Sequence, residues 1–228
     1  MEQETPVRGR SGPAAQRPVR DGADPMTPVP RCRVANGHDP GGACAEGACA
    51  EGAGAQALTT ARLVLEVPRI EEAPQILAIA GDPRTTVHNP SDHVADLPEA
   101  SHLVDRWLQH WAQHGLGYWC VREHDATEVV GYCGLKRMTA AGQPVLNLLY
   151  RFRSEVWGRG YATEAASAVV AWGSRHRPGE TILARVRPDN LASQRVALRA
   201  GLRRDPALDE PGEDGDDLAF SNRVPGRT

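Results

Sequence analysis

The most informative stretch of this chain is Trp157-Gly158-Arg159-Gly160-Tyr161-Ala162-Thr163-Glu164-Ala165. It joins an apolar strand-like run, residues 145–152, to a helix-like run that begins near Tyr161. Two glycines one residue apart permit positive φ and let the backbone approach a ligand closely. The first turn of a helix adds N–H groups without intrahelical partners and the positive end of the helix dipole. The stretch therefore indicates either a phosphate-binding loop or a tight strand–helix connection without a ligand.

Two other phosphate-binding loops do not fit this stretch. A Walker loop requires a Gly-Lys pair, and the only lysine of the chain is Lys136. A dinucleotide-binding loop requires a third glycine at the position that Thr163 occupies.

The order x-x-x-G-x-A, with Gly160 fourth and Ala162 sixth, resembles the acetyl-CoA pyrophosphate loop of the GNAT superfamily of N-acetyltransferases. The longer string W-G-R-G-Y-A-T-E-A is similar to the branch that contains the ribosomal-protein N-terminal acetyltransferases, the RimJ/RimL type. The resemblance runs from residue 58 to the end, about three quarters of the chain. Further matches follow in family order: the L-x-T-x-R-L-x-L strand at 58–65, the helix end at 80–84, the N-x-x-S-x-R-V segment at 187–196, and Ala200-Gly201-Leu202, where Leu202 replaces the usual aromatic residue.

The first 57 residues differ in composition from the rest of the chain. They contain no aromatic residue, they are rich in glycine and proline, and the segment 43–47 is nearly repeated as 48–52. Such a segment buries too little apolar surface to offset the entropy of ordering its backbone. We expect residues 1–57 to be a disordered low-complexity tail, with Met26 as an alternative start, and residues 58–228 to form one GNAT-like acetyltransferase domain.

Composition restricts the class of protein. A net charge of −3 argues against nucleic acid as the main partner. No apolar run reaches the length of a signal peptide or a membrane span, which predicts no membrane association. Five cysteines, an odd number, favour a reducing compartment and a cytoplasmic location. Their spacing matches no zinc site, so we expect no metal. A monomer or a homodimer is expected.

Hydrophobic periodicity predicts alternating strands and helices in the order β-α-α-β-β-β-α-β-α-β. This order is typical of an α/β protein with a mixed sheet flanked by helices. The resemblance adds that the sheet is mostly antiparallel and splayed at its fourth strand. The predicted strands are 63–67, 118–122, 129–136, 144–152, 181–186 and 218–224, the last after a loop rich in acids; the predicted helices are 71–80, 100–114, 161–176 and 191–200.

The resemblance implies that acetyl-CoA is the acetyl-donating co-substrate. Its pyrophosphate would bind at Trp157, Gly158, Arg159, Gly160, Tyr161, Ala162 and Thr163. The main chain around Phe152 would hold the pantetheine arm. Alternative interpretations are a core aromatic for Phe152, a packing ring for Trp157 and a solvated side chain for Arg159.

Asn190 and Ser193 are the candidate catalytic side chains. In the resembling enzymes the asparagine contacts the cofactor arm, and a nearby hydroxyl helps to protonate the departing thiolate. The alternative is that Asn190 is an ordinary N-cap and Ser193 a residue of the first helical turn. Many family members place a tyrosine on this helix, but none occurs between Asn190 and Gly201.

The general base is not assigned by the sequence. Family members often carry a glutamate on the fourth strand, where this chain has Asn147, and an amide cannot take a proton. His88, in the loop between the two early helices, has a suitable ordinary pKa but is equally a solvated loop residue.

These features predict an N-acetyltransferase in which a bound primary amine attacks acetyl-CoA directly. A protein N-terminus is the first candidate acceptor, because of the branch resembled. A small amine, such as an antibiotic or a polyamine-like molecule, is the second. A non-catalytic acyl-CoA-binding regulatory module is the alternative from another class, because both proton-transfer positions depart from the common pattern.

Overall fold

The computed structural model describes residues 57–223. The tail expected at residues 1–57 lies outside the described residues except for Ala57, which begins the first strand, so its disorder stays a prediction. Val224, the expected end of the last strand, also lies outside them.

All ten expected elements are present, in the expected order, together with several short ones. The strands are β1 (Ala57–Thr59), β2 (Leu63–Glu66), β3 (Tyr118–Glu123), β4 (Gly131–Ala140), β5 (Gln143–Phe152), β6 (Thr181–Val186), β7 (Arg203–Arg204), β8 (Glu210–Gly212) and β9 (Gly215–Ser221). The α-helices are α1 (Ala73–Ala80), α2 (Pro83–Thr86), α3 (Leu97–His114), α4 (Tyr161–His176) and α5 (Leu191–Arg199). Short 3-10 helices cover Ile70–Glu72, Pro90–Asp92, Ser154–Val156 and Pro206–Leu208.

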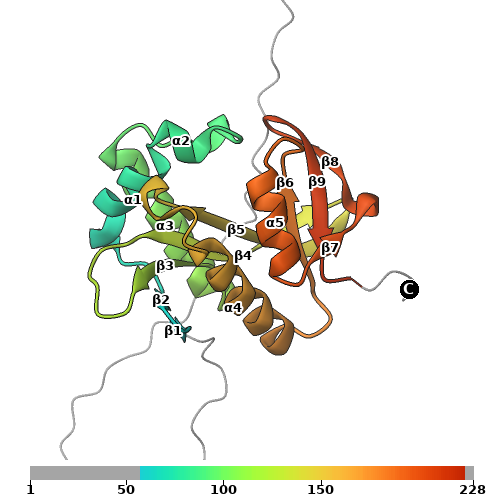
Figure 1. Ribbon diagram of the computed structural model, residues 1–228, viewed down its shortest axis with the longest axis horizontal. Coiled ribbons are helices and arrows are strands. Elements are labelled where there is room, and N and C mark those ends of the chain that lie inside the picture. The colour runs from blue at the N-terminus through green and yellow to red at the C-terminus, as the bar shows by residue number, and fades with distance from the viewer. Residues whose placement is uncertain (1–56, 224–228) are drawn as a thin grey trace, which may run out of the picture. The chain divides into compact units, whose positions relative to one another are not determined.

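The strands form one sheet in the order β1-β2-β3-β4-β5-β6-β9-β7, and β8 pairs with β9 (Figure 1). Neighbouring strands are antiparallel except for β5 and β6, which are parallel. The mixed, mostly antiparallel sheet predicted from the sequence is confirmed.

The parallel pair β5–β6 separates after three residues. Its register covers only Val145↔Thr181, Leu146↔Ile182 and Asn147↔Leu183. Beyond Asn147, β5 continues to Phe152 with β4 on one edge only, while β6 pairs with β9 on its other edge. Residues 148–152 therefore have one strand edge without a partner strand, and apart from the Phe152 carbonyl, which accepts the Trp157 indole N–H, their backbone groups there are available to a ligand. We call this opening the splay.

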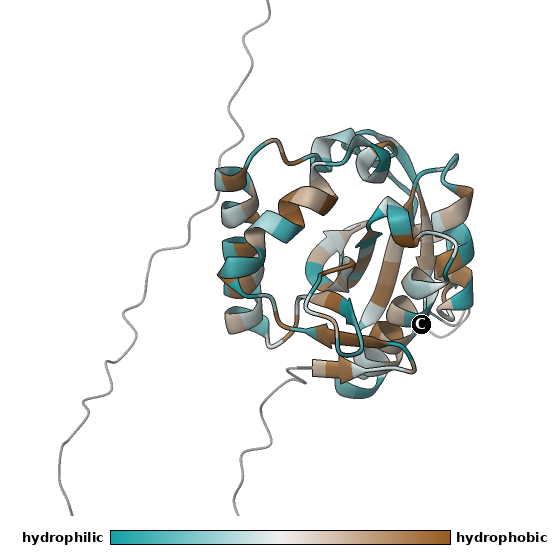
Figure 2. Cartoon of the chain, turned by 60° about the vertical axis from the view of Figure 1, so that its left-hand side comes forward, coloured by the Kyte–Doolittle hydropathy of each residue, from teal (hydrophilic) through white to brown (hydrophobic). Residues whose placement is uncertain are grey.

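Helices cover both faces of the sheet (Figure 1). Alternate residues of β5 point to opposite faces, as in any strand. Leu148 and Phe152 pack with α4 in one apolar core, whereas Leu149 packs on a second core formed with α1 and α3. Figure 2 shows the strands largely in the hydrophobic colour, while the peripheral helices carry many hydrophilic turns. The strand that borders the splay therefore presents one face to α4 and the other to α3.

The helix ends follow local sequence signals. Asp96 caps α3 by accepting a hydrogen bond from the Glu99 N–H at 2.9 Å, and α3 ends at Gly115 with φ of +63°. Asn190 caps α5 in the same way through the Ser193 N–H, also at 2.9 Å. By contrast, α4 begins at Gly160, which has no side chain to cap it.

The acidic loop expected before the last strand is instead a β-hairpin of β8 and β9. Arginines lie near the carboxylates of this region; Arg185 and Arg187 are remote in the sequence, whereas Arg204 is five residues from its partner. Asp217 is 3.7 Å from Arg185 and 3.9 Å from Arg187, while Asp209 pairs with Arg204. Because these cations offset the charge, the acids can lie on paired strands instead of a solvated loop.

Cys120 and Cys133 are buried free thiols. Within residues 57–223 no helix is both long and apolar enough to cross a membrane.

Candidate active site

The glycine loop between β5 and α4 presents unpaired N–H groups. Gly158 and Gly160 have φ of +78° and +81°, a conformation that only glycine adopts without strain. Within residues 57–223, the backbone N–H groups of both glycines and of Tyr161, Ala162 and Thr163 donate no hydrogen bond. Because α4 starts here without a side-chain cap, these donors and the positive end of the helix dipole can receive an anion such as a phosphate.

Glu164 fastens this loop to the turn between β1 and β2. Its carboxylate accepts hydrogen bonds from Thr60 Oγ1 at 2.6 Å, from the Arg62 N–H at 2.8 Å and from Arg62 Nε at 2.7 Å. Arg62 also donates to the Arg159 carbonyl at 2.9 Å. Burial favours the neutral form of Glu164, but the bonds from Thr60 and Arg62 outweigh it and lower the pKa of the carboxyl. The opening motif and the glycine loop, which are remote in the sequence, thus hold each other in place.

A cavity of about 530 Å³ opens at the splay, and we call it the splay cavity. The glycine loop, the start of α4, the end of β5, residues 84–88 and α5 line it. It contains every site residue predicted from the sequence except Arg159, namely Phe152, Trp157, Gly158, Gly160, Tyr161, Ala162, Thr163, Asn190 and Ser193. Arg159 is exposed and lies 3.6 Å from Glu123.

Trp157 and Phe152 are linked on the wall of this cavity. The Trp157 indole N–H donates to the Phe152 carbonyl at 2.9 Å, while half of the Trp157 side chain stays exposed. Phe152 itself is buried in the core next to α4. The packing interpretation of both rings is therefore compatible with main-chain contacts to a ligand.

Asn190 and Ser193 lie at the start of α5, on the wall of the splay cavity that α5 forms. The Asn190 side chain is the N-cap, as the alternative interpretation holds, and its amide also borders the cavity. Arg195 and Arg199 line the same wall and form no ion pair with any residue of the described range 57–223. These two cations suit the phosphates of a nucleotide, and sequence reasoning did not single them out.

Tyr150 is a functional candidate that sequence reasoning missed. Its hydroxyl donates to the Ser193 carbonyl at 2.8 Å and lies 2.9 Å from Ser193 Oγ, so it spans the splay from β5 to α5. Burial raises the pKa of Tyr150, which keeps the phenol protonated at neutral pH. The helix α5 carries no tyrosine, and β5 instead brings the Tyr150 hydroxyl to the start of that helix.

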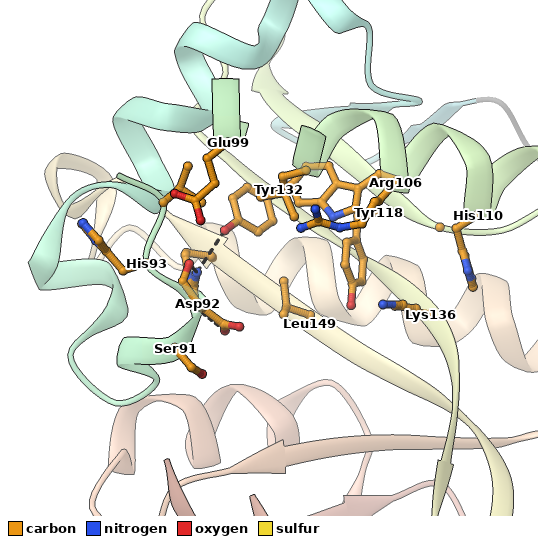
Figure 3. A pocket seen from close by; sticks show the side chains of 15 residues that line it. Ser91, Asp92, His93, Glu99, Arg106, His110, Tyr118, Tyr132, Lys136 and Leu149 are labelled. Atoms are coloured by element: carbon orange, nitrogen blue, oxygen red, sulfur yellow. Dashed lines mark hydrogen bonds and ion pairs between the residues drawn. The ribbon is translucent and has the colours of Figure 1, made fainter. Parts of the chain in front are cut away.

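A second cavity, of about 270 Å³, lies between α3 and the other face of the sheet, and we call it the α3 cavity (Figure 3). Leu149 and Arg151 of β5 line it, and Arg151 also lines the splay cavity. Arg151 is held by Asp92 at 2.7 Å and by the Tyr132 hydroxyl at 3.2 Å. The two cavities therefore approach each other at β5, next to the splay.

Asn147 stands at the last paired position of β5 and β6. Because side chains alternate between the two faces of a sheet, Asn147 lies on the same face as Leu149 and Arg151, which is the face toward α3. Its Oδ1 atom is buried and accepts no hydrogen bond from any residue in the described range. A buried carbonyl oxygen without a donor is costly unless a ligand or water supplies one. Asn147 lines neither cavity, its side chain is hydrogen-bonded to the Tyr118 hydroxyl, and its Oδ1 atom is a buried acceptor without a donor among residues 57–223, next to the apex of the splay.

His110 is the histidine of the α3 cavity with a strongly perturbed titration. Burial, together with nearby His114, Lys136 and Arg137, lowers the pKa of His110 to about 4. Its Nε2 atom accepts from the Arg137 N–H at 3.3 Å, which requires an unprotonated Nε2. At neutral pH the ring is therefore uncharged and its hydrogen is on Nδ1.

His88, the loop histidine considered as a base, lies elsewhere. It lines the splay cavity, and its Nδ1 atom is 3.3 Å from Asp189 Oδ1. It therefore does not border the α3 cavity. No cluster of histidine, cysteine, aspartate and glutamate within residues 57–223 could hold a metal ion.

Sequence comparison identifies the family of this chain. The model of the acetyltransferase (GNAT) domain matches residues 62–203, which is more than half of the chain. The uncharacterized protein YkkB of Bacillus subtilis is 34% identical over 89 residues, which cover 39% of this chain and 52% of YkkB. The match thus spans about half the length of that relative.

Solved acetyltransferases share the fold. An acetyltransferase from Agrobacterium tumefaciens is 28% identical, with a TM-score of 0.62 over 74% of this chain and 94% of that one. The ribosomal-protein-S5-alanine acetyltransferase of Vibrio fischeri, at 15% identity, has a TM-score of 0.58 over 72% and 94% of the two chains. That second likeness is one of fold, and it agrees with the RimJ/RimL-like resemblance of the sequence. The splayed sheet, the glycine loop and the family match lead to one conclusion: the chain belongs to the GNAT acetyltransferase family.

Proposed function

We propose that this protein is an acetyl-CoA-dependent N-acetyltransferase that acts on a primary amine. The observation that carries the proposal is the position of β5 between two cavities. Tyr150 and Phe152 line the splay cavity, Leu149 lines the α3 cavity, and Arg151 lines both. Acetyl-CoA on one face of β5 and the amine on the other face would meet where β5 separates from β6. Direct transfer of the acetyl group in a ternary complex needs this arrangement.

The splay cavity fits acetyl-CoA, the donor of the acetyl group. Free N–H groups of the glycine loop would bind the pyrophosphate, and Arg195 and Arg199 would bind further phosphate charge. The unpaired edge of residues 148–152 offers backbone groups to the amides of the pantetheine arm. A volume of about 530 Å³ lies within the usual range of ligand pockets, roughly 300–1,000 Å³.

The reaction forms a C–N bond and breaks a C–S bond. The acceptor must be a neutral amine when it attacks, so one proton leaves nitrogen and one proton finally reaches sulfur. Asn147 Oδ1 would accept a hydrogen bond from the amine and orient it. Since an amide is not a base, water takes the proton from the nitrogen.

Ser193 would stabilise the departing thiolate. Because the one hydrogen of the Tyr150 hydroxyl is donated to the Ser193 carbonyl, Ser193 Oγ donates to the Tyr150 oxygen, and its hydrogen would turn from there to the sulfur of bound acetyl-CoA. Because burial raises the pKa of Tyr150, complete proton transfer from this pair to sulfur is uphill. We therefore assign to Ser193 a hydrogen bond to sulfur, to Tyr150 the positioning of Ser193, and to water the proton that completes the thiol.

The acceptor class follows from the α3 cavity. Its volume of about 270 Å³ is just below the usual range of ligand pockets, so it suits a small amine or the first residue of a peptide. The resemblance favours a protein N-terminus. We also propose a cytoplasmic location, because five cysteines and two buried free thiols suit a reducing compartment.

A thiol-release assay tests the proposal. Acetyl-CoA is incubated with the full chain and a panel of N-terminal peptides, amino acids, polyamines and amino sugars, and the acetylated product is identified by mass spectrometry. Turnover with any amine supports an N-acetyltransferase. Binding of acetyl-CoA in calorimetry without release by any amine would instead identify a non-catalytic acyl-CoA-binding module.

A further inference from the structure

The α3 cavity carries an uneven distribution of charge. Its ionised side chains are the cations Arg106, Lys136 and Arg151 and the carboxylates Asp92 and Glu99. Figure 3 shows Asp92 and Glu99 toward one end and Arg106, Lys136 and His110 toward the other. The cavity is therefore polarised along its length.

The carboxylates do not neutralise the cationic end. Asp92 pairs with Arg151 at 2.7 Å, and Glu99 accepts a hydrogen bond from the Ala95 N–H at 2.7 Å near the start of α3. Arg106 and Lys136 form neither an ion pair nor a hydrogen bond with any side chain between residues 57 and 223. Two cations at this end of the cavity thus lack a counter-charge.

The strand register places this cationic end next to the apex of the splay. Lys136 of β4 is directly paired with Asn147 of β5, and Asn147 is in turn paired with Leu183 at the last β5–β6 position. The free acceptor Asn147 Oδ1 and the unpaired cation Lys136 therefore come from adjacent residues on the same face of the sheet.

The other side chains around Arg106 and Lys136 favour the binding of an anion and disfavour the binding of a cation. His110 stays neutral and, with its hydrogen on Nδ1, is a donor. The hydroxyl of the buried Tyr118 lines the same cavity and is a further donor. An arginine, a lysine and neutral donors together form the kind of site that binds a carboxylate or a phosphate.

We propose that the acceptor is an amine that carries a carboxylate or phosphate group near its nitrogen, and that Arg106 and Lys136 bind this anion. This inference rests on the proposed acetyl transfer and specifies its substrate class. The amine would lie against Asn147 and the anion against Lys136, so few bonds separate the two groups. A free amino acid or an aminophosphonate has this form, whereas an internal peptide bond places a neutral amide there.

Matched acceptors test the proposal in the thiol-release assay. Each amino acid is compared with its amide, and alanine is also compared with 1-aminoethylphosphonate. An alanine tripeptide with a free amino group and a blocked C-terminus represents a protein N-terminus. We expect kcat/KM for the preferred anionic acceptor to exceed that for the matching amide by about tenfold or more. The comparison of alanine with 1-aminoethylphosphonate shows whether the anionic group of the preferred acceptor is a carboxylate or a phosphonate.

Three variants locate the anion site. Lys136→Gln and Arg106→Gln should each raise KM for the anionic acceptor about tenfold while kcat/KM for the amide and KM for acetyl-CoA stay unchanged. The control is Arg175→Gln, at an exposed position of α4 that lines neither cavity, and it should change nothing. Equal use of acid and amide by an active wild-type protein, or preference for the tripeptide, would overturn the anion site and leave the acetyltransferase intact.

A chemical probe gives a readout that does not need turnover. Because Lys136 is the only lysine, its reductive methylation can be followed on one peptide by mass spectrometry. Propionate or ethylphosphonate, which carry the anion but no amine to consume the reagent, should protect Lys136, and propionamide should not. Protection in a protein that never releases thiol would retain the anion site and reject the proposed function. Equal modification with and without the anions would reject the anion site.

Discussion

The Tyr150 hydroxyl lies 2.8 Å from the Ser193 carbonyl oxygen and 2.9 Å from Ser193 Oγ. This contact joins β5 to α5 across the opening that the separation of β5 from β6 creates. It places two hydroxyls in the splay cavity, on the side of the sheet where α4 begins and where the glycine loop lies. In the proposed reaction, β5 would thus connect acetyl-CoA binding with stabilisation of the thiolate.

Replacing Ser193 with alanine should lower kcat about a hundredfold, near the bottom of the range for acid–base assistance, because water substitutes for part of the lost hydrogen bond. KM for acetyl-CoA should hardly change. Tyr150→Phe should lower kcat less, because it leaves Ser193 in place but without its partner. Steady-state kinetics with the best acceptor measures both effects, with Ser174→Ala on the exposed side of α4 as control. Full turnover by Ser193→Ala would show that Ser193 is only a helix residue.

Replacing Asn190 with alanine should act on both stability and binding. The variant loses the N-cap of α5, which costs about 1 kcal/mol of unfolding free energy, and it loses the amide that borders the splay cavity. Asn190→Asp keeps a capping oxygen but removes the amide N–H groups. We therefore expect denaturant unfolding to show normal stability for Asn190→Asp, while calorimetry shows weaker acetyl-CoA binding for both variants. Normal binding by Asn190→Asp would restrict the residue to its capping role.

The parts of the site that depend on local sequence were predictable. Positive φ at Gly158 and Gly160, the start of α4 and the Asn190 cap each follow from a few consecutive residues. The order of the strands and helices was also predictable, because apolar residues alternate along the strands and recur with helical periodicity along the helices. The splay was expected only through the family resemblance, since no local pattern records where two strands separate.

The parts that depend on tertiary contacts were not predictable. Tyr150 looked like one residue of an apolar strand, and only the packing of β5 against α5 brings it to Ser193. The hairpin at residues 210–221 was missed because Arg185 and Arg187, which lie beside Asp217, are about thirty residues away in the sequence. The partnership of Glu164 with Arg62 likewise joins segments a hundred residues apart. No short stretch of sequence predicts a contact between residues that lie so far apart along the chain.

Acid should destabilise the fold partly through His110. Its pKa in the folded protein is about 4, against an ordinary value of 6.5, because burial and the charges of His114, Lys136 and Arg137 disfavour the imidazolium. Between these two pH values the unfolded chain binds more protons than the folded chain, so stability falls as pH is lowered from about 6.5 to about 4. The contribution is constant outside this window.

His110→Gln should reduce that dependence, because glutamine keeps a hydrogen-bond acceptor for the Arg137 N–H but does not titrate. The measurement is the melting temperature at pH 7, 5.5 and 4, with His102→Gln on the exposed face of α3 as control. An equally steep loss of melting temperature on acidification in His110→Gln and wild type would contradict the assignment.

Truncation of the chain to residues 57–228 should leave the fold and the activity intact. β1 begins at Ala57 and pairs with β2, so this boundary keeps every described strand. We expect the melting temperature and acetyl-CoA affinity of the truncated protein to equal those of the full chain. A clear drop in melting temperature at the same protein concentration would show that residues 1–56 stabilise the domain.

Acetyl-CoA is proposed to bind with its pyrophosphate on the glycine loop. Gly160 and Gly179 offer a matched pair of positions, because their φ values are +81° and +85° and an added Cβ would meet no atom closer than 3.5 Å at either. Valine therefore strains the backbone similarly at both, but only Gly160 lies in the splay cavity.

The decisive measurement is calorimetric titration of acetyl-CoA into the wild type, Gly160→Val and Gly179→Val, each verified to be folded. We predict that Gly160→Val binds at least about tenfold more weakly than wild type, a loss of about 1.4 kcal/mol, because its side chain blocks the approach of the phosphates. Gly179→Val should bind as wild type does. Equal affinity of all three proteins for acetyl-CoA would show that the pyrophosphate does not bind at the glycine loop.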